Sequence, residues 1–401
     1  MPDIKKKFIA LFISAFASML GMGIIVPLMP VYAKTLSASG IWLGLIFSGF
    51  SLSRLIFMPL MGKMSDKKGR KKFICTGLFL YSLLTLGYVF ANSVFSLIWI
   101  RILHGFASAM TVPIIMAYVG DIAPKGREGR FMGYFNVSFF MGMGIGPFIG
   151  GILNDFFGMA SAFYTVSLLA ALALLFTFFF LSEETPSMIK KGELKKTPSY
   201  KKLFQNNLIK GLLIYRFIGA VGRGPLMAFL PIFAAGFGIT ASQIGIIISS
   251  NMLVMSILQI PFGRLADRYS KIRLIIFSGL IITLVLGTIP FVHTFRDLFL
   301  LNLFMGIGGA VGMPAVTAIN AIAGKKYGMA STMSLFSSAM SAGMVISPLI
   351  AGILMDTVGL KYVFFFGSSV TFIGVLVFYS FVKKYRKQIE AEQIQEQVDS
   401  E

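Results

Sequence analysis

The sequence predicts an all-α, polytopic membrane protein, and three observations indicate this class. First, 56% of the 401 residues are hydrophobic and only 13% are charged, about half the charged share of an average soluble chain. Second, the apolar residues form long continuous runs, which predict membrane-spanning helices rather than the alternating strands of a β-barrel. Third, 14% aromatic residues and a single cysteine exclude a disordered chain and a disulfide-framed secreted fold.

A helix needs about 20 mostly apolar residues to cross the hydrocarbon layer of a membrane. The chain contains twelve runs of this kind, separated by charge clusters, Gly/Pro and polar breaks. We interpret the first run as a retained helix, because it is too long for the core of a signal peptide. The predicted spans are residues 8–32, 41–62, 73–91, 94–119, 131–153, 161–181, 208–232, 243–263, 274–291, 298–320, 328–354 and 360–382.

The basic residues are distributed very unevenly between the two sides of this arrangement. Of the 36 Lys and Arg residues, 29 lie at the termini and in the connections on the same side as the termini. The opposite side has only Lys34, Arg296 and Lys361, and four arginines lie within spans. The positive-inside rule therefore predicts that both termini are cytoplasmic. The net charge of +20 then reflects topology and contact with anionic lipid headgroups, and we expect no nucleic-acid partner.

The two halves of the chain repeat one another at an offset of 201 residues. The segment GKMSDK at residues 62–67 matches GRLADR at residues 263–268. We therefore predict two parallel six-helix bundles, residues 1–181 and 208–382, joined by a cytoplasmic linker, residues 182–207, and followed by a cytoplasmic tail, residues 383–401. Transporters built from such repeats bind substrate near the middle of the membrane between the halves. The same offset relates Gly23 to Gly224, Pro30 to Pro231, Gly105 to Gly306, Pro113 to Pro314, Pro147 to Pro348, Gly151 to Gly352, Asp155 to Asp356 and Gly158 to Gly359.

Residues 62–72, GKMSDKKGRKK, resemble the signature of the cytoplasmic loop between helices 2 and 3 in the major facilitator superfamily. The resemblance implies the fold of that superfamily and a conformational switch that latches the outward-facing state. We expect Gly62 to let helices approach closely and Asp66 to cap a neighbouring helix or pair with a basic side chain. The second copy has Ser270 where the first has Gly69, so the motif is only partly kept in the second half. The residues assigned to the switch are Gly62, Asp66, Gly69, Arg70, Gly263 and Asp267.

Residues 142–151, GMGIGPFIGG, resemble the antiporter motif that is typical of exporters in this superfamily. Glycines spaced by four residues make a smooth helix face for close packing. Gly23, followed by Pro27 and Pro30, resembles a further pattern of the 12-helix drug:proton antiporters, and Arg101-x3-Gly105 resembles an arginine motif linked to proton coupling. The residues assigned to the exporter motif are Gly142, Gly146, Pro147, Gly150 and Gly151.

The predicted membrane interior is cationic. None of the 16 acidic residues lies within a span, whereas the spans contain Arg54, Arg101, His104, Arg216 and Arg223. A charge at the bilayer centre costs about 2.5–3.5 kcal/mol even on a lenient scale, so these side chains should face a central cavity or find partners. None of these five residues has the same residue type at the equivalent position, 201 residues away, in the other half of the chain. This is expected of site residues placed on a symmetric scaffold. Since arginine keeps its charge, it suits recognition of carboxylate or phosphate.

We therefore expect a cavity that binds an anionic or zwitterionic organic solute. Four of the five residues have a stated alternative role: Arg101 in structure or coupling, Arg54 as scaffold, Arg216 in a gate, and His104 as a packing residue. Arg223, beside Gly222 and Gly224, has the best claim as a ligand. His104 is the cavity candidate with a near-neutral reference pKa, and it shares a helical stripe with Arg101, Ser108 and Thr111. Lower-ranked polar positions that line the path are Asn136, Asn251, Gln259 and Asn302.

The function predicted from these features is proton-coupled efflux of a small organic, amphipathic compound by a secondary transporter of a prokaryotic-type inner membrane. The alternative is an uptake carrier or proton symporter for an organic anion, which the cationic cavity fits equally well. The sequence has no Walker loop, metal cluster or nucleophile constellation, so we expect neither an enzyme nor an ATP-driven pump. We expect no cofactor beyond a proton gradient, a small-molecule substrate and the lipid bilayer as partners, and a monomer.

Overall fold

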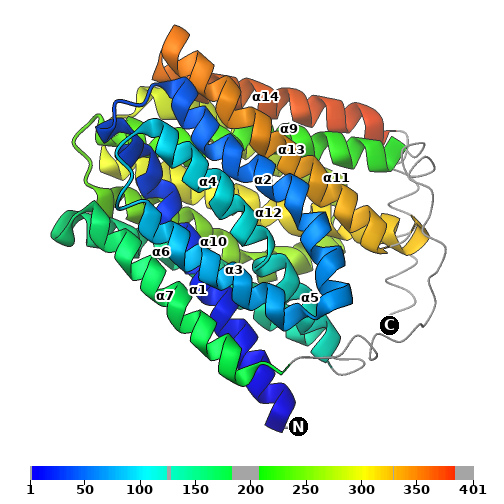
Figure 1. The fold of residues 1–401 in the computed structure, drawn as a ribbon. Coiled ribbons are helices and arrows are strands. Elements are labelled where there is room, and N and C mark those ends of the chain that lie inside the picture. The colour runs from blue at the N-terminus through cyan, green and yellow to red at the C-terminus, as the bar shows by residue number, and fades with distance from the viewer. Residues whose placement is uncertain (1, 124–127, 183–206, 328, 384–401) are drawn as a thin grey trace.

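The structure is a computed structural model that describes residues 2–123, 128–182, 207–327 and 329–383. Within these ranges the chain forms helices joined by short turns, and successive long helices run in alternating directions (Figure 1). The elements are α1 (Pro2–Thr35), α2 (Gly40–Lys68), α3 (Arg70–Gly87), α4 (Val94–Ala109), α5 (Val112–Ile122), α6 (Glu128–Phe157), α7 (Met159–Phe180), α9 (Asn207–Ala235), α10 (Ala241–Arg268), α11 (Lys271–Thr288), the 3-10 helix η2 (Ile289–Phe291), α12 (Phe295–Tyr327), α13 (Met329–Thr357) and α14 (Leu360–Val382).

Eleven helical segments of the described residues are long and apolar enough to cross a membrane. Each predicted span coincides with at least one helix, and α3 differs from the eleven because it begins with three basic residues, starting at Arg70. Residues 94–119, expected as one helix, are divided into α4 and α5 at Met110 and Thr111. Pro113 lies in the first turn of α5, where its missing N–H costs no intrahelical hydrogen bond. Apart from their ends, the predicted linker and tail lie outside the described residues.

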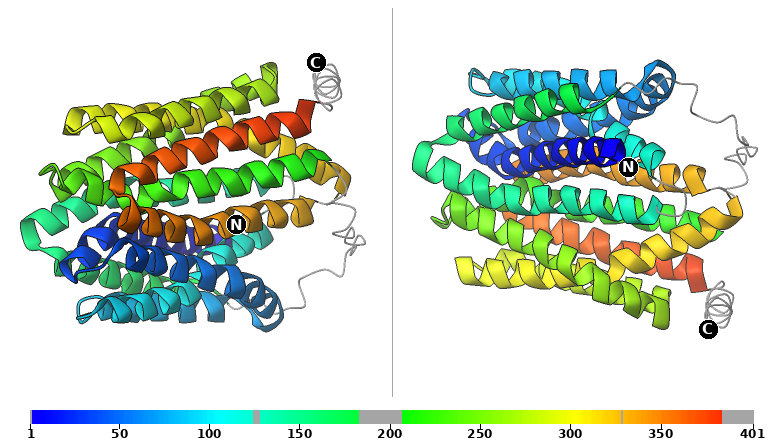
Figure 2. Two further views of the ribbon diagram at one scale, coloured as in Figure 1. Left: turned by 90° about the horizontal axis from the view of Figure 1, so that it is seen from above. Right: turned by 90° about the horizontal axis from the view of Figure 1, so that it is seen from below.

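The helices form two groups that lie side by side (Figure 2): α1–α7 and α9–α14. α1 begins and α14 ends at the same end of the bundle (Figure 1), which we call the terminal end; the opposite end is the distal end. Three of the buried hydrophobic clusters lie within one group, at residues 10–181 in the first group and at residues 226–364 and 212–382 in the second. A further cluster spans both groups, because it joins buried residues of the first group between Leu20 and Ala170 to Ala228, Phe229, Ala351 and Val363 of the second. The core of each group is therefore built mainly from its own helices.

Three glycines of the exporter motif make α6 pack directly on the backbone of α1, whereas Gly151 lies against Ala241 and Ser242 at the start of α10. A Cβ atom added to Gly146 would lie 2.6 Å from Cα of Gly23, and one added to Gly142 would lie 2.8 Å from the backbone nitrogen of Leu20. Gly150 similarly lies against Ile24. Gly23 is one of the residues that repeat at the 201-residue offset, and its place at this contact explains why a side chain does not fit there.

We predict that Gly146→Ala strongly lowers the stability of the folded protein. The added methyl group would meet backbone atoms of Gly23, and overpacking of this kind costs about 1–3 kcal/mol. Thermal unfolding of the purified protein in detergent would show a lower midpoint. Gly120→Ala is the matched control, because open space surrounds that position on α5 and alanine favours a helix. A Gly146→Ala midpoint equal to that of Gly120→Ala would contradict the close packing of α1 on α6.

Candidate functional site

The five cationic positions predicted from the sequence lie on three helices. Arg54 is on α2, Arg101 and His104 are on α4, and Arg216 and Arg223 are on α9. Among the described residues none of the four arginines forms an ion pair with a carboxylate, in contrast to Arg70, which pairs with Asp121. Their charges must therefore be accommodated by other groups.

Three of these residues surround the aromatic ring of Phe50 on α2, and we call this arrangement the Phe50 cluster. The guanidinium carbon of Arg101 lies 4.3 Å from the centre of the ring, that of Arg54 lies 5.7 Å away, and the imidazole of His104 meets the ring edge-on at 6.0 Å. A desolvated cation–π contact stabilises by about 2 kcal/mol. Arg101 is 1% exposed, so the ring replaces part of the hydration that this cation has lost.

The Phe50 cluster also contains buried donors that lack a hydrogen-bond partner. Within the described part of the chain, Nε and Nη1 of Arg101 and Nε of Arg54 are buried and unpartnered. Such groups carry a desolvation cost of about 1–3 kcal/mol, and more when they are charged. The cluster therefore has unused capacity to bind acceptor oxygens.

His104 is completely buried and bonded to an aromatic partner. Its Nδ1 lies 2.9 Å from the hydroxyl of Tyr88, and the ring of Tyr81 packs edge-on with its centre 4.1 Å away. The Tyr88 hydroxyl also interacts with Arg101. Nε2 of His104 is one of the unpartnered buried atoms. In this conformation the histidine is thus enclosed between α2, α3 and α4.

The predicted stripe on α4 does form one buried helix face. Arg101, His104, Ser108 and Thr111 are each at most 1% exposed. This face packs against α2 and α3 rather than facing an open passage, which differs from the expected cavity position of Arg101 and His104. Thr111 ends the stripe, because the chain leaves the helical conformation there.

In the second group, Arg216 is held by sulfur atoms and an aromatic ring. Its Nη2 donates to Sδ of Met340 at 2.7 Å and its Nη1 to Sδ of Met313 at 3.8 Å, while the Phe336 ring lies 4.7 Å from the guanidinium carbon. Thioether sulfur is a weak acceptor, so an anionic oxygen would bind this cation more strongly. Arg223, two turns along α9, is partly buried and has Tyr215 as an electrostatic neighbour.

The asparagines differ in their surroundings. Asn251 is buried, and its Nδ2 donates to the backbone oxygen of Asn302 at 3.1 Å, which joins α10 to α12. Asn302 in turn donates to the backbone oxygen of Leu298. Asn136 is exposed on α6. Asn251 is therefore a bridge between helices, whereas Asn136 is accessible on its helix.

The predicted switch begins with a turn that requires glycine. Gly69 has φ 92°, a left-handed conformation that side chains disfavour, and it separates α2 from α3. The next residue, Arg70, pairs with Asp121 at the end of α5. The second copy turns differently, because Ser270 has φ −57°. The departure of the second copy from the motif therefore corresponds to a difference in backbone conformation.

Gly62 and Gly263 occupy open positions in this conformation. A Cβ atom added to either residue would meet nothing within 4 Å, so the expected close helix approach at Gly62 is not present here. The reason is that α2 and α10 do not touch another helix at these positions near the terminal end. The side chains of Asp66 and Asp267 lie outside the described residues, and the switch itself stays a prediction.

The family model described as Major Facilitator Superfamily matches residues 11–220 and again residues 212–398. The chain belongs to the Major Facilitator Superfamily. It is accordingly a multi-pass membrane protein of a transporter family. The two matches divide the chain close to the boundary between the two helix groups.

Similar proteins support the same assignment over almost the whole chain. An uncharacterised MFS-type transporter of Methanocaldococcus jannaschii is 32% identical over 94% of this chain and 99% of its own length. Multidrug resistance protein 2 of Bacillus subtilis is 30% identical over 92% of this chain and 94% of its own length. A bacterial homolog of the human lysosomal transporter Spinster, solved inward-facing and occupied, superposes with a TM-score of 0.82 at 14% identity, covering 96% and 97% of the two chains.

Several side chains that contact the predicted site residues were not themselves predicted from the sequence. Phe50 precedes Arg54 by four residues, a spacing that places both on one helix face, so this contact could have been found. Tyr88 is 16 residues from His104 and lies in the turn that follows α3, and no local pattern indicates their contact. The same holds for Met340, which meets Arg216 only because α9 packs on α13.

We predict that Tyr88→Phe destabilises the protein by about 1–3 kcal/mol, the usual cost of leaving a buried polar group unpaired. The group concerned is Nδ1 of His104, which would lose the tyrosine hydroxyl. Thermal unfolding in detergent measures the change, and Tyr164→Phe, at an exposed position on α7, provides the matched control. Equal midpoints for the two variants would contradict a structural role for the hydrogen bond between Tyr88 and His104.

Proposed function

We propose that this protein is a multidrug-type efflux transporter that exports small, amphipathic organic compounds. The observation that carries this proposal is the end-to-end similarity to multidrug resistance protein 2 of Bacillus subtilis. The glycine-lined contact between α1 and α6 supports it, because the motif that resembles the exporters' signature forms this contact. The same relative favours export over the alternative of uptake.

The membrane topology is part of the proposal. Twelve spans result when α3 is added to the eleven long apolar segments. Residues 1–181 and 208–382 would then be two six-helix bundles, with residues 182–207 as linker and 383–401 as tail. The basic residues gathered at the terminal end favour a cytoplasmic position for both termini, so the distal end would face outward across the cell membrane.

The passage would open alternately at its two ends. The two helix groups meet along α2–α13 and α6–α10, whereas Gly62 and Gly263 have open space beside them near the terminal end. This arrangement suits a conformation that is closed outside and open inside. Substrate would bind between the groups and leave outward after the groups rock against each other.

We propose that the cargo carries a carboxylate or another anionic group. The unpartnered Nε of Arg54 and the weak sulfur partners of Arg216 support this choice. The surrounding aromatic rings and methionines would accommodate an apolar body of variable shape. The proton gradient would supply the energy, with His104 as the titratable group, and a single chain would be sufficient.

Transport can be tested in liposomes with an imposed pH gradient. A thermal-shift screen with carboxyfluorescein as anion, a quinolone as zwitterion and ethidium as cation identifies which charge class binds. Efflux of the compound that stabilises the protein in this screen is then measured as its proton-driven accumulation in inverted vesicles. Accumulation that persists after the pH gradient is collapsed would contradict proton coupling, and stabilisation by ethidium alone would contradict an anionic cargo.

We predict that Arg54→Ala and Arg223→Ala each reduce this accumulation at least tenfold while folded protein is retained. Removing either cation deletes an attraction for the anionic group of the cargo, and a charge-assisted hydrogen bond is worth about 1.5–3 kcal/mol. Arg296→Ala, which alters an exposed arginine at the distal end, is the control and should transport normally. Unchanged transport by both cavity variants would refute the cationic site.

A further inference from the structure

The two helix groups are joined at the distal end by a carboxylate at the end of α13. One oxygen of Asp356 accepts the backbone N–H of Gly40 at 2.6 Å, and the other accepts the N–H of Ile41 at 2.8 Å. These are the first two amides of α2, which carry the positive end of the helix dipole and have no partner within the helix. The side chain therefore caps a helix that belongs to the other group.

A second contact repeats the first at the 201-residue offset. Asp155, near the end of α6, accepts the N–H of Ala241 at 3.2 Å and the N–H of Ser242 at 2.7 Å. These residues begin α10. The two carboxylates thus bind the helix N-termini of opposite groups in the same way, and we call the pair the distal latches.

Below the first latch, small residues allow α2 to approach α13 closely. Gly40 lies against the backbone of Gly352, and a Cβ atom on Gly44 would come within 2.5 Å of the backbone oxygen of Pro348. One turn further, Oγ of Ser48 donates to the backbone oxygen of Val345 at 2.5 Å. The residues of α2 involved are spaced by four, so they form one helix face.

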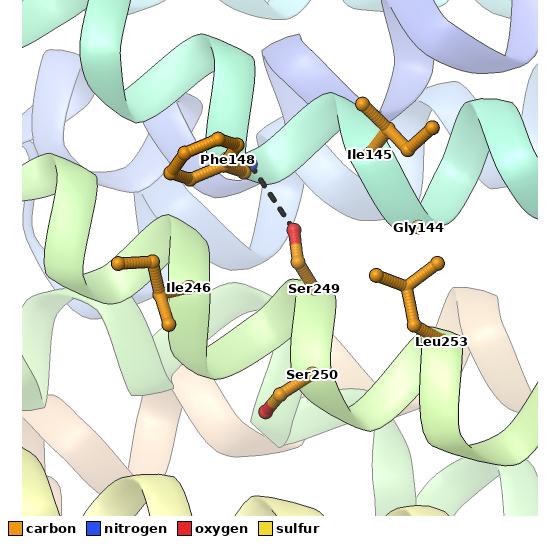
Figure 3. Close-up of a pocket in the computed structure, with 7 residues that line it drawn as sticks. All are labelled: Gly144, Ile145, Phe148, Ile246, Ser249, Ser250 and Leu253. Atoms are coloured by element: carbon orange, nitrogen blue, oxygen red, sulfur yellow. Dashed lines mark hydrogen bonds between the residues drawn. The ribbon is translucent and has the colours of Figure 1, made fainter.

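The contact of α6 with α10 has the same construction. Gly245 lies against the backbone oxygen of Pro147, and Oγ of Ser249 accepts the N–H of Phe148 at 3.1 Å (Figure 3). Gly245 and Ser249 correspond to Gly44 and Ser48 at the 201-residue offset. Figure 3 also shows Gly144 and Leu253 beside each other on the two helices, where a groove of about 240 Å³ lies along the contact.

We propose that Asp155 and Asp356 are the positioning residues of the distal gate. Together they hold the first turns of α10 and α2 in the outward-closed conformation, and their joint release opens the passage to the outside. This inference rests on the alternating-access mechanism proposed above. It assigns the gate to two carboxylates that touch neither the Phe50 cluster nor Arg216.

The chemistry of the latch suits a gate that must open in every cycle. A carboxylate has two oxygens and accepts two amides at once, whereas a neutral side chain provides fewer acceptors of lower strength. Both carboxylates lie at helix ends, so water can solvate them and the freed amides after separation. Closure is therefore favourable without being irreversible, because neither group becomes a buried unpaired charge when the gate opens.

The gate can be tested by measuring the distance between the two groups with spin labels. Phe90 and Phe291 are related by the 201-residue offset, belong to opposite groups, and are 77% and 70% exposed beyond the distal ends of α3 and α11. Cysteines at these positions, with Cys75→Ser to remove the native thiol, give one labelled pair for pulsed electron spin resonance in lipid nanodiscs.

Adding Asp155→Asn and Asp356→Asn together should shift this pair toward longer distances, with the open-to-closed ratio rising on the order of tenfold for each latch. The matched control is Asp297→Asn, because Asp297 also lies at the distal end but accepts a hydrogen bond from Thr294 within its own group. The control should keep the parental distances. A double variant whose distances equal those of the parent would overturn the proposal.

A second pair of substitutions opens the same contacts without altering the carboxylates. Gly44→Ala with Gly245→Ala places methyl groups against the backbone of Pro348 and Pro147 and should also lengthen the distance. If only the glycine variant shifts, the contacts close the gate without the latches, and the proposal is wrong. Since this readout needs no cargo, failure of the parental protein to export an anionic compound, together with the expected shift in the variants, would refute the proposed substrate and leave the gate intact.

Discussion

Close approach of helix backbones is the constraint on which this structure depends. Lipid provides little hydrophobic drive for helices to associate, so contacts at small residues and a few interhelical hydrogen bonds decide which helices pack. Gly146 against Gly23 fixes α6 on α1 within one group, and Gly44 against Pro348 brings α2 to α13 between the groups. Both contacts adjoin a buried core, and the second also ends in two hydrogen bonds to Asp356, which suits a contact that opens.

A second constraint is that the interior must stabilise arginine side chains that have no carboxylate partner. Arg101 rests on the ring of Phe50, and Arg216 donates to methionine sulfur. At the position equivalent to Arg101 the second group has Asn302, a neutral amide that bonds to its own helix. The scaffold thus repeats while the polar interior does not, and the unrepeated cations are the groups with spare capacity for an anionic ligand.

The distal latches show why a duplicated scaffold suits a transporter. Asp155 and Asp356 make equivalent contacts on the two sides of the interface, so in the proposed mechanism opening of the distal end separates α6 from α10 and α2 from α13 together. The proposed cargo site, by contrast, is asymmetric. In the proposed mechanism the two groups rock as rigid bodies without rearranging the residues proposed to bind the cargo.

The sequence by itself determined the helices, their approximate ends and the repeat, because hydrophobic run length, charge clusters and the 201-residue offset are properties of the chain alone. It also indicated the glycine face of α6, since spacing by four places residues on one helix face. Only the tertiary structure decided that Arg101 and His104 face α2 and α3, that Tyr88 bonds to His104, that Gly62 lies in open space, and that Asp155 and Asp356 cap helices of the opposite group. Those contacts join residues from 16 to more than 300 positions apart, and no periodicity in a single helix specifies which neighbour its polar face will meet.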